Sequence, residues 1–263
     1  MDLGIAGKVA LVAASSRGLG RAVAAGLAAE GCKVALCARD EAAVRGSAEA
    51  IARESGAQTL GIPADVTSEA DIARLVGEAR EKLGPISILV LNAGGPSAGT
   101  FETLTDALWQ QAFELNLMSA VRLIRACLPD MKAAHWGRVI AMTSTTVKQP
   151  VSNLMLSNSI RAGVSGLLKT LADELAPDGI LVNNVATGRF DTDRLRSLEK
   201  GQADRQGRTW EQVRAASEAE IPLGRLGRVA EYADTVTYLA SERASYVTGV
   251  TLQVDGGLVR STF

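Results

Sequence analysis

The stretch KVALVAASSRGLG, residues 8–20, joins a short apolar run to a turn that contains two glycines. The apolar run has the length of a buried strand, and the alanine-rich segment after the turn predicts a helix over 19–31. Glycines at such a junction let the backbone approach a pyrophosphate, and the free amides of the helix amino terminus favour phosphate there. The alternative is an ordinary glycine turn without a ligand. We expect a dinucleotide here, contacted by Ser15, Ser16, Arg17, Gly18, Leu19 and Gly20.

Apolar runs of strand length alternate with helix-length segments along the rest of the chain. This rhythm predicts an α/β fold of the Rossmann type, a doubly wound parallel sheet with helices on both faces, in a single domain over residues 1–263. Ligands of such sheets bind at the carboxyl ends of the strands. The strands are expected at 8–14, 33–38, 59–64, 86–91, 138–142, 180–186 and 251–254.

Two helical segments carry local signals that bear on the site. A long helix is expected over 107–132, with an interruption near Pro129, because proline lacks an amide hydrogen and crowds the preceding turn. Ser68, with Asp71 three residues later, has the form of a capping box that starts a helix. The other helices are expected at 41–55, 68–83 and 156–175.

A polar stretch before the last helix and strand departs from this rhythm. We expect residues 193–221 to form an inserted, mobile helical flap over the substrate site. Its arginines are suited to an anionic substrate such as a phosphopantetheine carrier, or else they only solvate the outer face of a helix. These arginines are Arg194, Arg196, Arg205, Arg208 and Arg214.

Composition excludes several classes of function. With Lys+Arg 28 against Asp+Glu 29 and a formal net charge of -1, the chain has no electrostatic case for binding nucleic acid or an anionic membrane. The amino terminus lacks the pattern of a signal peptide, and no apolar run is long enough for a transmembrane helix, which favours a cytoplasmic protein. Cys32, Cys37 and Cys127 lack metal-ligand spacing, so we expect reduced, buried thiols and no metal site.

The end of the second expected strand indicates which dinucleotide is bound. Dinucleotide sites usually place an acid there for the ribose hydroxyls, whereas this chain has Ala38-Arg39. A carboxylate would repel a 2′-phosphate, and a guanidinium can bind it through two hydrogen bonds. Arg17 adds a second cation in the glycine turn. We therefore expect NADP rather than NAD, the alternative being that both arginines only cap a solvated edge.

Motifs along nearly the whole chain resemble those of the short-chain dehydrogenase/reductase family, in particular its 3-oxoacyl-(acyl carrier protein) reductase branch. The segment 13–20 is similar to the family's TGxxxGxG turn, with Ala14 in place of the first glycine. The segment 137–144 is similar to the strand that ends in the catalytic serine, so the resemblance implies catalytic roles for Ser144 and for Asn116. The further cofactor contacts that it implies are Asp65, Val66, Asn92, Ala93, Gly94, Arg161, Gly188 and Thr192.

The chain departs from the family at the residues that transfer the proton. The family's tyrosine lies thirteen positions after the serine and its lysine four further on; counted from Ser144, these are Ser157 and Arg161. A phenol beside an ammonium can be tuned toward neutral pH, whereas a serine hydroxyl is a far weaker acid and arginine stays protonated. We expect an altered proton path: Ser144 and Ser157 hydrogen-bond the carbonyl or alkoxide, Arg161 stabilises negative charge, and a water relays the proton.

Three functions remain open on these observations. The first is an NADP-dependent oxidoreductase that interconverts a carbonyl and an alcohol, on a small molecule or on a substrate linked to an acyl carrier. The second is an NADP-binding pseudoenzyme or sensor without turnover, and the third is a scaffold subunit. The resemblance implies a homo-oligomer, a tetramer or a dimer. Lys148 is a candidate replacement cation or acid, and the single histidine, His135, is expected in a surface turn.

Overall fold

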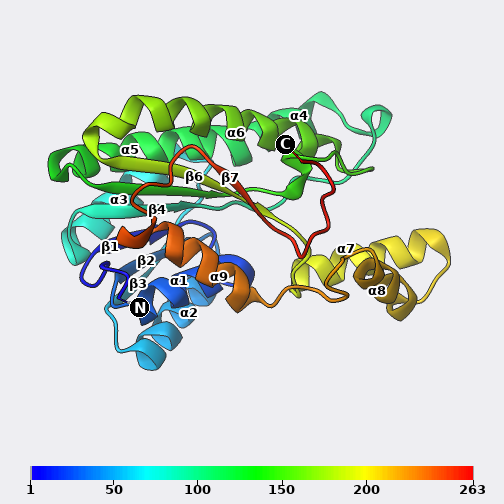
Figure 1. The fold of residues 1–263 in the computed structure, drawn as a ribbon, viewed down its shortest axis with the longest axis horizontal. Helices are drawn as coiled ribbons and strands as arrows, with labels where there is room; N and C mark the ends of the chain where they lie inside the picture. Colours follow the sequence, from blue (N-terminus) through cyan, green and yellow to red (C-terminus); the bar gives the residue numbers. More distant parts are fainter. Residues whose placement is uncertain (1, 263) are drawn as a thin grey trace.

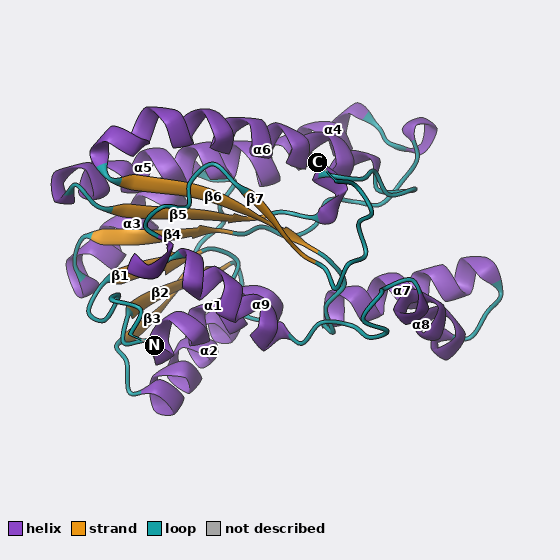
Figure 2. Cartoon of the chain, viewed as in Figure 1, coloured by secondary structure: helices purple, strands orange, loops and turns teal. Residues whose placement is uncertain are grey.

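The computed structural model describes residues 2–262 and contains a seven-stranded parallel sheet (Figures 1 and 2). The strand order is β3-β2-β1-β4-β5-β6-β7, so the chain starts inside the sheet, winds to one edge and then winds to the other. The doubly wound, Rossmann-type sheet predicted from the sequence is confirmed. The strands are β1 (Val9–Val12), β2 (Lys33–Ala38), β3 (Thr59–Pro63), β4 (Ile86–Leu91), β5 (Gly137–Met142), β6 (Ile180–Thr187) and β7 (Thr251–Val254).

Helices cover both faces of this sheet (Figure 1). The core on one face is built with α1, α2 and α9, and the core on the other face with α3, α5 and α6. The bounds of the six are α1 (Gly18–Ala29), α2 (Glu41–Ser55), α9 (Val229–Leu239), α3 (Glu69–Leu83), α5 (Ser119–Ala134) and α6 (Met155–Leu175).

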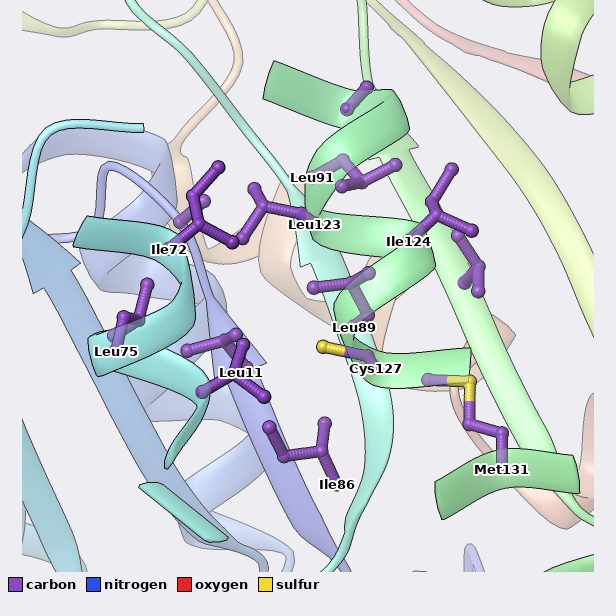
Figure 3. Close-up of a cluster of buried hydrophobic side chains, with 14 of the residues drawn as sticks. Leu11, Ile72, Leu75, Ile86, Leu89, Leu91, Leu123, Ile124, Cys127 and Met131 are labelled. Atoms are coloured by element: carbon purple, nitrogen blue, oxygen red, sulfur yellow. The ribbon is translucent and has the colours of Figure 1, made fainter. Parts of the chain in front are cut away.

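The central strands are buried on both faces because each lies between two helical layers. Leu11 and Leu89 pack into the cluster beside α3 and α5 (Figure 3), whereas their neighbours Val12 and Val90 enter the cluster beside α1 and α9. Continuous apolar strands are expected in this arrangement, since alternate side chains enter different cores. Each such Leu or Val side chain stabilises the fold by about 1.5–3 kcal/mol.

The three cysteines lie in these cores as free, buried thiols, as expected. Burial raises the pKa of Cys37 to about 11 and the pKa of Cys32 and Cys127 to about 12. They are therefore protonated at neutral pH and act as apolar packing groups, Cys127 among the side chains of Figure 3.

The long helical segment after β4 is interrupted at a different place from the one expected. Pro129 lies inside α5 without breaking it, so the predicted interruption there is wrong; the irregularity is the π-helical turn Glu114–Met118, between α4 (Asp106–Phe113) and α5. The helix continues past the proline because Met131 is buried in the core. Asp130 also accepts a hydrogen bond from Ile86 N at 2.9 Å, which ties this turn to β4.

Helix α3 begins with only half of the expected capping box. Ser68 Oγ accepts a hydrogen bond from Asp71 N at 3.2 Å. The Asp71 carboxylate does not return the bond to Ser68; it accepts one from Asp65 N at 2.8 Å. This backbone hydrogen bond lowers the pKa of Asp71. The prediction of a reciprocal box is thus wrong, and Asp71 fixes the loop between β3 and α3.

The segment 193–221 contains two helices, α7 (Asp193–Gln206) and α8 (Trp210–Ala219), which extend away from the sheet beyond the end of β6 (Figure 1). Each helix is capped by a threonine: Thr192 accepts a hydrogen bond from Leu195 N, and Thr209 accepts one from Gln212 N. Within residues 2–262, no helix has the length and apolar character needed to cross a membrane.

Candidate active site

The turn after β1 brings the amino terminus of α1 to the carboxyl edge of the sheet. Gly18 has a φ of 59°, and the N-cap residue Arg17 makes no side-chain hydrogen bond to the first amides of the helix. Ser16 is half-buried and Arg17 is exposed beside it. Ala14, at the position of the family's first glycine, also has a positive φ, 46°. Helix amides that no side chain caps, together with the helix dipole, are suited to a diphosphate.

Gly20 and Asn92 hold this turn in shape. A Cβ on Gly20 would lie 2.5 Å from Ala14 O and 2.8 Å from Asn92 Nδ2. Asn92, which follows β4, donates from Nδ2 to Ala14 O at 3.0 Å. The close approach of these three groups therefore requires glycine at position 20.

Two other turn residues direct their side chains into the protein. Ser15 is fully buried; its Oγ donates to Val12 O at 2.7 Å and accepts from Cys37 N at 3.2 Å. Leu19 packs on the core between α1 and the sheet. These side chains fasten the turn to β1 and β2, and Ser15 N adds a hydrogen bond to Cys37 O at 2.9 Å. In this pair the amide left for a ligand is that of Leu19, in the first turn of α1.

A pocket of about 300 Å³ lies where β2 and β3 end. Arg39 and Asp65 line it, and Arg74 from α3 adds a second guanidinium that sequence reasoning missed. Asp65 Oδ1 accepts hydrogen bonds from Thr67 N at 2.9 Å and Thr67 Oγ1 at 2.8 Å. The Val66 side chain belongs to the core. Asp71 also lines the pocket and lies 3.4 Å from Arg74, so Arg39 is the guanidinium without an ion pair there among residues 2–262. Arg39 on a firmly held loop suits a ribose that carries a phosphate.

Ser144, Thr146 and Ser157 are joined by hydrogen bonds where β5 ends. Ser144 Oγ accepts a hydrogen bond from Thr146 N at 3.2 Å, and Thr146 Oγ1 lies 3.2 Å from Ser157 Oγ. Thr146 and Ser157 are buried, with 4% and 8% of their surface exposed. Thr146 joins the two serines of the candidate site and was missed by sequence reasoning; its only signal was a hydroxyl two residues after Ser144.

Arg161 lies one helical turn after Ser157 on the buried face of α6. Its Nη1 donates to Met142 O at 3.0 Å, and the residue is 9% exposed. Burial lowers the pKa of Arg161 from 12.5 to about 10, and no carboxylate of residues 2–262 acts against that shift. A buried cation without a carboxylate is costly, so this position marks a site where an anion is expected to bind.

Asn116 lies in the π-helical turn, a distortion that is common at functional sites. Its Nδ2 donates to Ala112 O at 3.3 Å, while its buried Oδ1 has no partner among residues 2–262. Asn116, Arg161, Asn92 and Ala93 line a cavity of about 20 Å³. That volume can hold one water molecule, and Asn116 and Arg161 offer an acceptor and donors for it.

The loop after β6 lies beside the glycine turn. Thr192 Cγ2 lies 3.9 Å from the position of a Cβ on Gly18. A Cβ on Gly188 would lie 2.5 Å from Asp255 Cα, so this glycine is required for packing against the end of β7. Around Gly94 nothing lies within 4 Å of a Cβ, so the backbone after β4 faces open space.

The remaining candidates occupy different places. Tyr232 is fully buried, burial raises its pKa, and Thr187 Oγ1 donates to its hydroxyl at 2.9 Å, so it is not a replacement proton donor. His135 ends α5 just before β5, whereas Ser144 follows β5 at the opposite edge of the sheet. Lys148 directly follows the short turn after Ser144 and stays near the site.

A family model described as enoyl-(acyl carrier protein) reductase matches residues 13–259. The 3-oxoacyl-[acyl-carrier-protein] reductase FabG of Escherichia coli is 38% identical over 252 residues, which cover 96% of this chain and 97% of the relative.

Solved structures agree with these sequence relatives. The L-sorbose reductase of Gluconobacter frateurii, complexed with NADPH and L-sorbose, is 34% identical with a TM-score of 0.95, covering 99% of this chain and 100% of that one. An NADPH-bound short chain oxidoreductase of Pseudomonas aeruginosa that contains an atypical catalytic center is 32% identical with a TM-score of 0.89, covering 97% and 98%. The chain therefore belongs to the short-chain dehydrogenase/reductase family.

Proposed function

We propose that this protein is an NADPH-dependent oxidoreductase that reduces a carbonyl to an alcohol. The observation that carries this proposal is the hydrogen-bonded set of half-buried Ser144 with buried Thr146 and Ser157, with the unneutralised Arg161 one helical turn after Ser157. The relatives named above include reductases and NADPH complexes on the same fold, which supports the same chemistry here.

The residues of the crevice fit a dinucleotide that carries a 2′-phosphate. The amides of α1 behind Gly18 and Gly20 would hold the diphosphate, and Arg39 and Arg74 would hold the 2′-phosphate. The backbone at Gly94 faces the open space that the nicotinamide end requires. When bound, NADPH supplies the hydride.

The protein's own residues supply the proton and stabilise the charge on the carbonyl oxygen. Ser144 Oγ already accepts a bond from Thr146 N, so its hydroxyl proton is available to the substrate oxygen. Ser157 transfers its proton to that oxygen and receives another through Thr146 Oγ1 or a water. Arg161 stabilises the negative charge during the transfer. The small cavity that it shares with Asn116 can hold a water beside Arg161, although Ser157 does not line that cavity.

The substrate in this proposal is a small carbonyl compound, or one linked to an acyl carrier as the name of the E. coli relative suggests. Helices α7 and α8 act as the flap over it, because the loop that leads into α7 lies beside Gly18. The proposal also includes that the active enzyme is a homo-oligomer, either a tetramer or a dimer.

Replacing Thr146 tests the proton path. Thr146→Val keeps the shape of the side chain and removes its hydroxyl, so kcat for ketone reduction should fall about 10- to 100-fold. Thr146→Ser should retain most of the rate. Thr145→Val is the matched control: Thr145 is equally buried, and its side chain makes no hydrogen bond to Ser144 or Ser157. Steady-state oxidation of NADPH with a panel of ketones measures the rates.

The pH profile separates this path from one that uses Lys148. The Ser and Thr hydroxyls do not ionise in the working range, and the pKa of Arg161 is about 10, so kcat should be flat between about pH 6 and pH 9. If kcat instead changes with pH in that range, and the change is absent in Lys148→Met, Lys148 is the residue that donates the proton to the substrate oxygen. NADPH binding without turnover of any ketone would favour the sensor, because Ser157 replaces the phenol.

Arg39→Ala tests the choice of cofactor. Loss of the guanidinium should weaken NADPH binding about 10- to 100-fold and leave NADH binding unchanged, because only NADPH carries the 2′-phosphate. Arg74→Ala should have a smaller effect of the same kind, since Arg74 is also bonded to Pro63 O. Arg45→Ala, which removes an exposed arginine paired with Glu41 on α2, is the control. Equal losses for both cofactors would contradict the assignment.

A further inference from the structure

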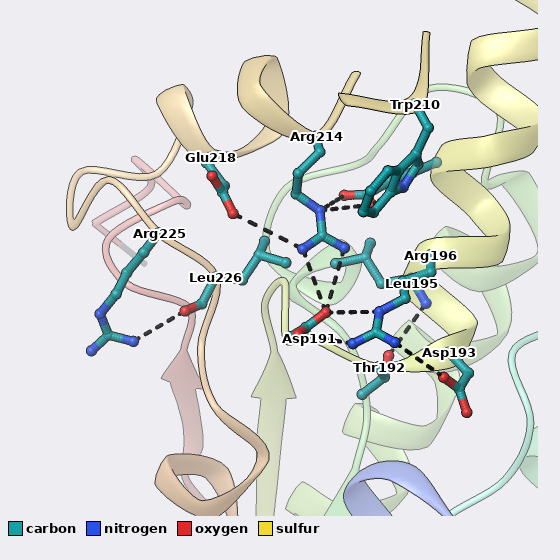
Figure 4. Close-up of polar contacts among 11 residues, drawn as sticks. Asp191, Thr192, Asp193, Leu195, Arg196, Trp210, Arg214, Glu218, Arg225 and Leu226 are labelled. Carbon is teal, nitrogen blue, oxygen red and sulfur yellow. Dashed lines mark hydrogen bonds and ion pairs between the residues drawn. The ribbon is translucent and has the colours of Figure 1, made fainter. Parts of the chain in front are cut away.

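The arginines of the flap differ in whether a carboxylate neutralises them. Asp191 lies between Arg196 and Arg214, at 3.1 Å and 3.4 Å (Figure 4). Arg214 also lies 2.9 Å from Glu199. Arg194, in the first turn of α7, forms no ion pair with any carboxylate of residues 2–262, and neither do Arg205 and Arg208; what distinguishes Arg194 is its contact with the loop after β4. Its charge is therefore left available at the base of the flap.

Arg194 reaches back across the crevice, away from the acids of the flap. Its Nη2 donates to Pro96 O at 3.4 Å and lies 3.2 Å from the position of a Cβ on Gly95. Gly95 and Pro96 directly continue the Asn92–Gly94 stretch after β4. The guanidinium thus lies over the loop that borders the reaction site.

Arg161 lines a cavity together with Asn92 and Ala93 of the same stretch. Burial is the main cause of the lowered pKa of Arg161, and the positive charge of Arg194 adds a smaller contribution in the same direction, a weak repulsion between the two groups. Two like charges at a partly dry site are unfavourable without an anion. An anionic group bound between the flap and the β4 loop would relieve this repulsion.

The phosphate groups of the cofactor are assigned to two other sites and do not need Arg194. The amides of α1 at Gly18 suit the diphosphate, and the pocket at Arg39 suits the 2′-phosphate. Thr192, the N-cap of α7, lies beside Gly18, whereas Arg194 is directed to Gly95 and Pro96. Arg194 is therefore left for the other ligand of the site.

We propose that the substrate is an anionic carbonyl compound and that Arg194 binds its carboxylate or phosphate. The planar guanidinium can grip either group through two hydrogen bonds, while Ser144 and Ser157 bind the carbonyl oxygen. This inference rests on the proposed reductase activity and narrows its substrate class. It makes Arg194 a specificity-determining residue, distinct from the other arginines of the flap.

Matched pairs of substrates test the inference. Levulinate is compared with methyl levulinate, and dihydroxyacetone phosphate with dihydroxyacetone, so that the two sources of negative charge are separated. For at least one pair, the anion should have a kcat/KM about 10- to 100-fold above its neutral partner. In Arg194→Met this ratio should fall to about 1, and Arg194→Lys should restore part of it. Arg205→Met, an exposed arginine near the other end of α7, should keep the ratio of the wild type.

Binding measurements give a second readout that does not depend on turnover. Calorimetry of the complex with NADP should show binding of levulinate or glycerol phosphate that Arg194→Met weakens about 10-fold or more. Turnover of the neutral ketones with no preference for anions would overturn the inference and leave the proposed function standing. A loss of NADPH affinity in Arg194→Met of the same size would also overturn it, because Arg194 would then bind the diphosphate. If neither neutral nor anionic ketones turn over, the proposed function fails; anion binding lost in Arg194→Met would still support the site.

Discussion

Gly20→Ala is expected to weaken NADPH binding about 100-fold and to lower the free energy of unfolding by about 1 to 3 kcal/mol. The added Cβ would lie 2.5 Å from Ala14 O, a backbone atom, and 2.8 Å from Asn92 Nδ2. Neither neighbour is free to move, because Asn92 Nδ2 donates to Ala14 O at 3.0 Å. The turn must therefore shift, and the amides of α1 shift with it. Fluorescence titration with NADPH and thermal unfolding measure the two effects.

Gly46→Ala is the matched control for this substitution. Gly46 lies inside α2, and nothing lies within 4 Å of a Cβ built on it. Alanine is favoured over glycine in a helix, so this variant should be more stable by about 0.5 to 1 kcal/mol, with NADPH affinity unchanged. If Gly20→Ala binds NADPH as tightly as the wild type, the diphosphate does not bind at this turn.

Arg161→Met is expected to lower kcat for ketone reduction about 100- to 1000-fold while making the protein more stable. The rate falls because the buried guanidinium stabilises the charge that develops on the substrate oxygen, a contribution of about 2.7 to 4 kcal/mol when one such group is removed. Arg161→Lys keeps a cation and should retain part of the rate. Unchanged kcat in Arg161→Met would remove Arg161 from the mechanism.

The gain in stability follows from the same burial. Burial lowers the pKa of Arg161 from 12.5 to about 10, so the folded state holds this proton less tightly than the unfolded state. The buried positive charge therefore lowers the free energy of unfolding at every pH below about 10, and this destabilisation disappears as the pH rises toward 12.5. At pH 7, removing the charge should raise the free energy of unfolding by about 1 kcal/mol or more. Differential scanning calorimetry of both forms without cofactor measures the change.

Arg138→Met is the control for Arg161→Met, because it should lower stability and leave kcat unchanged. Arg138 is also buried, but it lies at the amino end of β5, next to Glu242 at 3.5 Å and over the Trp136 ring at 4.1 Å. Its loss should lower the free energy of unfolding by about 1 to 3 kcal/mol and leave kcat of the folded enzyme unchanged. If the two variants behave alike, burial alone explains the effect of Arg161.

The central strands β1 and β4 were predictable from the sequence because they are buried and apolar along almost their whole length. The expected strands 33–38, 86–91 and 251–254 coincide with β2, β4 and β7, and the others differ by one or two residues at their ends. A strand buried on both faces carries a continuous apolar signal, and glycine and proline mark its ends. This local signal does not depend on which strand is the neighbour.

The irregular helix was not predictable from local rules. The rule for proline places a break at Pro129, yet burial of Met131 and the hydrogen bond from Ile86 N to Asp130 keep α5 intact there. The π-helical turn at Glu114–Met118 instead carries Asn116. No local pattern marks that turn, because its geometry depends on how α4 and α5 pack.

The candidate site also contains residues that the sequence identified and one that only the folded structure reveals. The resemblance to the family identified Ser144, and counting along the sequence to the family's tyrosine and lysine positions gave Ser157 and Arg161. Thr146 could not be counted in this way. It belongs to the site because a short turn folds its hydroxyl against Ser157 on another element.

The sequence by itself determined the doubly wound sheet, the glycine turn at its edge and the cations that replace the usual ribose-binding acid, because each is a local pattern of residue types. The tertiary structure decided which charges remain without a counter-ion. The flap contains arginines that look alike in sequence, yet Arg196 and Arg214 share Asp191 and Arg194 alone reaches the β4 loop. Charge pairing depends on distances across elements, and only the folded chain sets those distances.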